Sequence, residues 1–317
     1  VRTAESFLRF GHFELMSAQK EIDTLQKLTD FTIKNYYPEI TSEGEQKYKD
    51  FFQSVCTKTA DLMVEWFRVG FVHGVMNTDN MSVLGLTIDY GPFSMIDKYN
   101  LNFTSNTTDL TKKKYAFGKQ GQISQWNLWQ LANALFALIK DEKFLEETLN
   151  SYGTYFWEAH DKMLCNKFGF DELQETDEDF FTNWQGLMQE LQLDYTLFFN
   201  VLEKIDTVSD LKTDFQKISY TILNEFKLKK LENFIEQYQL RLKNNTISTE
   251  ESLNLMKKTN PKFILRNYLL FECIEEINEG KTEMLDKLTK ALENPYEEIY
   301  PEFSAKRPST YDDISGC

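Results

Sequence analysis

The chain has 317 residues, of which 41% are hydrophobic, which is enough to bury the core of one large domain or of two. Lys and Arg number 35 against 50 Asp and Glu, and the net charge of −15 argues against a nucleic-acid partner, whose phosphate backbone requires a basic face. The sequence has no apolar run of about 18 residues, so neither a membrane span nor a membrane partner is expected.

Hydrophobic periodicity predicts a mainly α chain with few strands. In its first half we expect a strand end at 1–3, helices over 13–33 and 45–71, a polar loop, a short strand over 84–88, a second loop over 100–114, and helices over 124–139 and 144–162. From about residue 170, acidic loops alternate with amphipathic helices, which are expected over 177–191, 208–220, 221–242, 249–257 and 264–279. Trp126, Trp129 and Phe136 lie at helical spacing and are predicted to be core residues.

The four cysteines are scattered without a CxxC pair, so a zinc site is not expected and their low density suits a reducing compartment. Cys317, at the end of the chain, is the strongest redox candidate, although a tail cysteine without a role is slightly favoured over a redox function.

The segments from His73 to Asn80 and from Leu86 to Phe93 carry the most informative polar residues. Asp79, Asn80 and Asp89 fall within eleven residues, with alternating apolar positions between them. Phosphoryl-transfer sites use such a set, because one acid can accept the proton of the attacking hydroxyl while an Asn and a second Asp hold Mg²⁺ against phosphates. The alternative is a buried turn in which Asp and Asn act as caps.

Together with Tyr115-Ala116-Phe117, Gln125 to Leu128, Asn260-Pro261-Lys262 and Leu265 to Leu269, these segments resemble the selenoprotein O family of kinase-like proteins. The resemblance implies a protein adenylyltransferase that moves AMP from ATP to Ser, Thr or Tyr hydroxyls of proteins. It assigns Asp79 as the catalytic base and Asn80 and Asp89 as ligands of Mg²⁺, with Mn²⁺ as the other candidate metal. Asp89 also belongs to the nucleotide site, where Arg2 and Arg9 would bind the phosphates.

By the same resemblance, residues 1–12 would be the remnant of an N-lobe and hinge, 13–140 the kinase-like C-lobe with a short strand pair at the catalytic loop, and 141–317 a helical extension. The chain opens without Met in the middle of a motif, so we expect an N-terminally truncated fragment that is inactive alone. The compartment would be cytoplasmic for a bacterial source and mitochondrial for a eukaryotic one.

Two other functions remain open from the sequence. One is a catalytically silent, pseudokinase-like binding module. The other is an ordinary protein kinase, which is disfavoured because the Asn of a kinase catalytic loop lies about five residues after the Asp, whereas Asn80 is adjacent to Asp79. His73 is expected to hold the loop, and Arg266 to brace the fold.

Overall fold

The computed structural model describes residues 3–205 and 210–312; Arg2 and Cys317, which the sequence singled out, lie outside them. The described residues form twelve α-helices and one two-stranded sheet. This confirms the predicted mainly α class, and the small strand pair beside the polar loop agrees with a kinase-like C-lobe. The chain divides into two compact units, the first with Val1–Trp66, Val72–Phe93 and Thr104–His160, and the second with Phe67–Phe71, Ser94–Phe103 and Asp161–Cys317.

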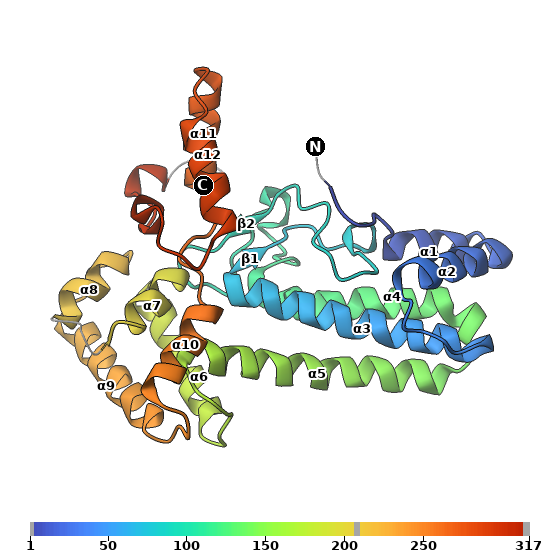
Figure 1. Ribbon diagram of the computed structural model, residues 1–317, viewed down its shortest axis with the longest axis horizontal. Helices are drawn as coiled ribbons and strands as arrows, with labels where there is room; N and C mark the ends of the chain where they lie inside the picture. Colours follow the sequence, from blue (N-terminus) through green and yellow to red (C-terminus); the bar gives the residue numbers. More distant parts are fainter. Residues whose placement is uncertain (1–2, 206–209, 313–317) are drawn as a thin grey trace. The chain divides into compact units, whose positions relative to one another are not determined.

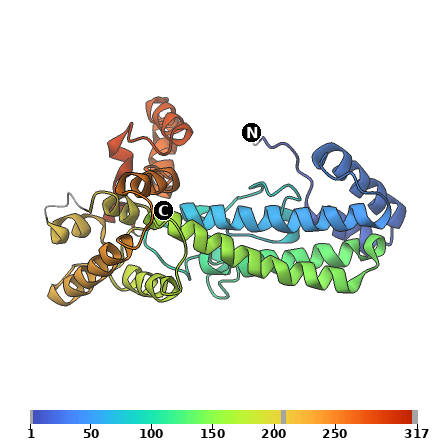
Figure 2. The ribbon, with the colours of Figure 1, turned by 60° about the horizontal axis from the view of Figure 1, so that its bottom comes forward.

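The helices of the first unit surround a core in which α4 is central. They are α1 (Phe10–Ala18), α2 (Ile22–Tyr36), α3 (Gly44–Val69), α4 (Gln120–Ile139) and α5 (Glu142–Phe168), the last turns of α3 and α5 belonging to the second unit. Within the unit α1 packs against α4, and both ribbon views show α3, α4 and α5 running side by side (Figures 1 and 2). The Tyr152 ring of α5 reaches α4, where its hydroxyl lies 2.5 Å from Ser124 Oγ.

Strands β1 (Phe71–Val72) and β2 (Ser94–Met95) bracket the loop that carries the predicted site. The predicted strand over 84–88 is wrong. Residues 82–85 form a turn and 86–90 have no strand pairing, and Gly85 adopts a φ of +67°. A Cβ at Gly85 would lie 2.7 Å from the Lys58 carbonyl oxygen, so the turn requires glycine both for its conformation and for its close approach to α3.

Two further predictions fail in the first unit. The helix expected over 13–33 is two helices, because Lys20 has a φ of +60° and ends the first of them. Trp126, Trp129 and Phe136 are not core residues, since 46%, 52% and 47% of their surfaces are exposed. The opposite side of α4 is the buried one, through Ser124, Asn127, Leu128, Leu131 and Leu135.

The second unit contains the shorter helices. They are α6 (Asp177–Glu190), α7 (Tyr195–Leu202), α8 (Leu211–Ile218), α9 (Glu225–Leu242), α10 (Thr249–Thr259), α11 (Asn267–Asn278) and α12 (Glu283–Glu293); α7 and α12 were not predicted. Aromatic rings fill its core around Phe168, whose ring centroid lies 5.1 Å from Phe180, 5.4 Å from Trp184 and 5.2 Å from Phe199. Aromatic pairs at such separations add favourable edge-to-face contacts to the burial of apolar area.

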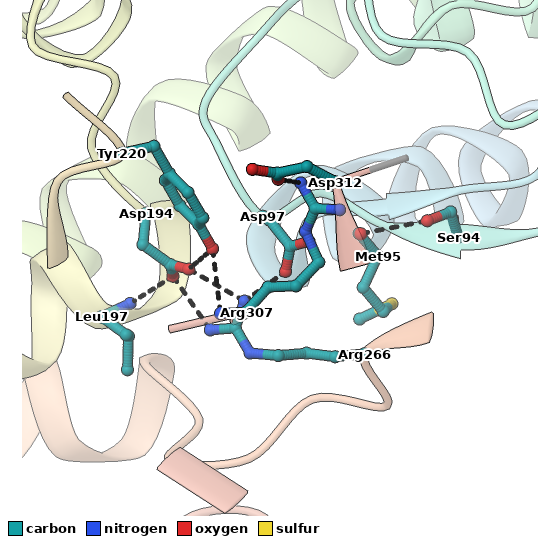
Figure 3. A network of polar contacts seen from close by, with 9 residues as sticks. All are labelled: Ser94, Met95, Asp97, Asp194, Leu197, Tyr220, Arg266, Arg307 and Asp312. Carbon is teal, nitrogen blue, oxygen red and sulfur yellow. Dashed lines mark hydrogen bonds and ion pairs between the residues drawn. The ribbon is translucent and has the colours of Figure 1, made fainter. Parts of the chain in front are cut away.

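A buried ion network braces the second unit, which confirms the predicted role of Arg266 (Figure 3). Arg266 is 1% exposed; its guanidinium binds both oxygens of Asp194 at 2.8 and 2.9 Å and Asp97 at 2.5 Å. Arg307 Nε lies 3.0 Å from the other oxygen of Asp97. Burial raises the pKa of Asp97, and the Arg266 charge opposes that rise. Because Asp194 also accepts from the Leu197 N–H, the network fixes the start of α7 as well.

No helix among residues 3–205 and 210–312 is both long and apolar enough to cross a membrane.

Candidate active site

The loop between β1 and β2 is closed by His73, as the sequence predicted. His73 is fully buried, and its Nδ1 accepts from the Val75 N–H at 3.3 Å. The proton therefore lies on Nε2, which donates to the Ile88 carbonyl at 2.8 Å and joins the two ends of the loop. The ring centroid of Trp66 lies 5.4 Å from that of His73, and the indole N–H donates to Thr87 Oγ1 at 2.8 Å. His73 thus positions the backbone just before Asp89.

Three amide side chains that the sequence analysis missed hold the same loop from outside. Gln120 Oε1 accepts from the His73 N–H at 3.0 Å, Asn127 Nδ2 donates to the Met76 carbonyl at 3.0 Å, and Asn106 Nδ2 donates to the Gly74 carbonyl at 3.2 Å. Gln120 and Asn127 lie on α4 and are fully buried. Their polar type on an apolar helix face was the available signal, because a buried amide requires a partner.

Asp79 and Asn80 occupy one turn of 3-10 helix, Thr78–Asn80. Asn80 Nδ2 donates to the Val75 carbonyl at 2.8 Å, which orients the amide and leaves its oxygen as the end that can approach a cation. Asp79 is exposed, so its carboxylate is accessible to a substrate hydroxyl. Its Oδ1 lies so close to Gly11 of α1 that a Cβ there would come within 2.0 Å of it. Gly11 is therefore a further residue of the site that the sequence did not reveal.

Asp89 and Arg9 meet in an ion pair, with Arg9 Nη2 2.7 Å from Asp89 Oδ2. The pair forms because the segment that precedes α1 runs antiparallel to the loop: the Phe10 N–H donates to the Met81 carbonyl at 3.0 Å and the Val83 N–H to the Leu8 carbonyl at 3.1 Å. Asp89 has a φ of +52°, a conformation that is costly for a residue with a Cβ. Such strain at a carboxylate is typical of functional loops.

The Arg9–Asp89 contact is close but poorly aligned, so it is an ion pair rather than a directed hydrogen bond. Asp89 Oδ2 and Arg9 Nε are both buried atoms without a hydrogen-bond partner. An acceptor oxygen of this kind fits a divalent cation, and Mg²⁺ is usually held by one or two carboxylates plus phosphate oxygens and water. The described residues contain no group of three or more His, Cys, Asp or Glu side chains that could hold a metal. If a metal binds at this loop, Asp89 and Asn80 would be the protein's own ligands.

The first turn of α1 brings the predicted residues to one place. Arg9 contacts Asp89 and Gly11, two residues later, contacts Asp79, which is itself adjacent to Asn80. The structure thus gathers four of the five residues singled out from the sequence, and the fifth, Arg2, lies outside the described residues.

Relatives of this chain match it over its whole length. The family model "Protein adenylyltransferase SelO" matches residues 1–293. Proteins named protein nucleotidyltransferase YdiU are 42% identical over 321 residues in Cytophaga hutchinsonii, 38% over 326 in Flavobacterium johnsoniae and 37% over 322 in Xanthomonas oryzae pv. oryzae. Each of these alignments covers 100% of this chain but only 61% or 62% of the relative. The chain therefore belongs to the SelO family of protein adenylyltransferases.

Proposed function

We propose that the polypeptide containing this chain transfers AMP from ATP to Ser, Thr or Tyr hydroxyls of proteins in a Mg²⁺-dependent reaction. The observation that supports this most strongly is the meeting of Arg9 and Gly11 with the two carboxylates of the loop, Asp89 and Asp79. Family membership supports the reaction type, because the family model is named for adenylyl transfer.

In this proposal each residue has one task. The substrate hydroxyl oxygen attacks the α-phosphorus of ATP, pyrophosphate leaves with the electrons of the broken P–O bond, and Asp79 accepts the hydroxyl proton. Asn80 and Asp89 would hold Mg²⁺, which supplies charge neutralisation to the phosphates. Arg9 carries a permanent charge, so it can exchange its contact with Asp89 for a phosphate oxygen when nucleotide and metal are present.

Two radiolabelled forms of ATP test the reaction in the natural polypeptide that contains this sequence. We expect label on protein from α-labelled ATP and none from γ-labelled ATP. Label from the γ position alone would make the protein a kinase, and Mg²⁺–ATP binding without either label would indicate a silent binding module.

Variants of the two acids separate their tasks. Asp79→Asn should lower turnover by about 10²- to 10⁴-fold with nearly unchanged Mg²⁺–ATP affinity in calorimetry, because a general base acts mainly in the transition state. Asp89→Ala should remove the Mg²⁺ dependence of nucleotide binding. Glu158→Gln, at an exposed acid of α5, is the matched control and should keep the turnover and the Mg²⁺–ATP affinity of the parent. Equal losses of rate and affinity in Asp79→Asn would make Asp79 a ligand rather than a base.

A further inference from the structure

A cavity of about 450 Å³ lies within the second unit, and none of the residues of the candidate active site lines it. Its wall comes from α7, α8, the segment between α10 and α11, and the segment that follows α12. This volume falls in the range of about 300–1,000 Å³ that is usual for small-molecule sites.

The lining of this cavity reverses the charge balance of the chain. Four lysines and two acids line it, whereas acids exceed bases by 15 in the whole sequence. The lysines, Lys204, Lys217, Lys262 and Lys306, come from four separate places in the sequence, so their gathering is a product of the fold. Leu197, Val201 and Ile218 provide an apolar wall beside them.

The contacts of the ammonium groups show how an anion could be accepted. Lys306 Nζ donates to the Ser219 carbonyl at 2.6 Å, so the only contact found for it within the described residues, besides the Tyr220 ring, is with a neutral oxygen. Lys217 pairs with Asp214 at 2.7 Å, but its side chain is 66% exposed, and exposed ion pairs contribute little and can open. Lys262 is 13% exposed and pairs with the buried Glu203 at 2.5 Å.

Glu203, the ion-pair partner of Lys262, is itself not fully hydrogen-bonded. One of its carboxylate oxygens, Oε1, is buried without a hydrogen-bond partner. Burial raises the pKa of Glu203 and the Lys262 contact opposes that rise, so burial is the larger effect.

We propose that this cavity is a binding site for a small phosphate ester with an apolar body. Lysine binds phosphate as a point charge, and several lysines from different elements suit a group with more than one negative charge. The apolar wall favours an ester over inorganic phosphate, because the ester buries apolar surface there. The site is independent of the proposed transfer reaction and uses none of its residues.

Calorimetry with phenyl phosphate, inorganic phosphate and benzoate, in the presence of a metal chelator, tests this site. We expect one saturable site for phenyl phosphate, with at least about tenfold weaker binding of the other two. Asp89→Ala should bind phenyl phosphate like the parent, since it alters only the candidate active site. Equal affinity for phenyl phosphate and inorganic phosphate, or no saturable binding, would overturn the proposal.

Two matched pairs of variants locate the site. Ala305 lines the cavity and is exposed, so Ala305→Glu should fold and lower the affinity by at least tenfold, whereas Ala305→Gln, of similar size, should have a much smaller effect. Lys217→Gln should weaken binding, whereas Lys243→Gln, at an exposed lysine after α9, should not. Thermal unfolding of each variant checks its fold. Identical binding by Ala305→Glu and Ala305→Gln would place the ligand elsewhere.

Discussion

At the residue scale, Gly11 determines how closely α1 approaches Asp79. A Cβ at this position would lie 2.0 Å from Asp79 Oδ1 and 3.1 Å from its Cγ, so Gly11→Ala must displace the carboxylate. A shift of about 1 Å in a reacting group can cost about 10²-fold in rate, and we expect a loss of that size in adenylyl transfer. The measurement is the rate of AMP incorporation at saturating ATP.

Gly153→Ala is the control for Gly11→Ala. Gly153 lies inside α5, and its Cβ would meet nothing closer than 3.8 Å. Alanine there should keep full activity and raise stability by up to about 1 kcal/mol through helix propensity. Unchanged activity in Gly11→Ala would show that the carboxylate at 79 need not hold its position.

The residues of the site differ in how far the sequence could reveal them. Asp79, Asn80 and Asp89 stand in one contiguous motif, so residue type and spacing sufficed to single them out, although their roles stay predictions. Gly11 and Asn127 act through approaches between segments far apart in sequence, to Asp79 and to the Met76 carbonyl. Such approaches depend on tertiary packing, which local patterns do not encode.

At the element scale, α10 offers a clear test of capping. Ser248 Oγ accepts from the Glu251 N–H at 3.2 Å, and Glu251 Oε2 accepts from the Ser248 N–H at 2.9 Å, forming a capping box. Ser248→Ala should lower the free energy of unfolding by about 1 kcal/mol, as for other N-cap serines. Thr249→Ala, one residue further on, should be close to neutral. Chemical denaturation of both variants at pH 7 makes the comparison.

The same capping box predicts how the free energy of unfolding should depend on pH. The backbone and hydroxyl hydrogen bonds from Ser248 lower the pKa of Glu251 below its ordinary value of 4.5. The stabilisation from the charged Glu251 side chain is therefore present above pH 4.5, and it is lost as the pH falls through the lowered pKa of Glu251. The free energies of unfolding of Ser248→Ala and of the parent should differ most at neutral pH and least in acid. A difference that grows towards low pH would contradict this assignment.

The helices also show what hydrophobic periodicity can predict and what it cannot. The apolar pattern located α4 and α9 well, because each has enough turns for the repeat to be clear. It could not say which stripe of α4 is buried, since Trp126 and Trp129 form a second apolar stripe on the side opposite the buried one. The break at Lys20 carries no glycine or proline, so nothing in the local sequence announced it.

At the scale of the whole molecule, hydrophobic periodicity correctly predicted a mainly α chain, but it could not give the boundaries of the two compact units. Their boundaries cut through α3 and α5, at Trp66 and His160, where the sequence shows no linker of glycine or proline. Chain segments that are distant in sequence, such as 94–103 and 161–317, share one unit. The predicted boundaries at residues 12 and 140 stay predictions about the family's lobes.

The thiols provide a measurement that covers both units. Cys56, Cys165 and Cys273 are buried without disulfides, and burial raises the pKa of each, that of Cys165 to about 12. With a pKa of about 12, roughly one thiol in 10⁴ is ionised at pH 8, and only the thiolate reacts rapidly. Titration with a disulfide reagent should therefore give at most one fast equivalent per native chain, and four after guanidinium unfolding.

A Cys317→Ser variant makes this titration decisive. It leaves only the three buried thiols, which should react slowly, at rates set by the local opening of each unit. Because Cys56 belongs to the first unit and the other two to the second, separate slow phases would report two opening free energies. Three fast equivalents in this variant would mean that neither core excludes the reagent, and the burial described for these side chains would be wrong.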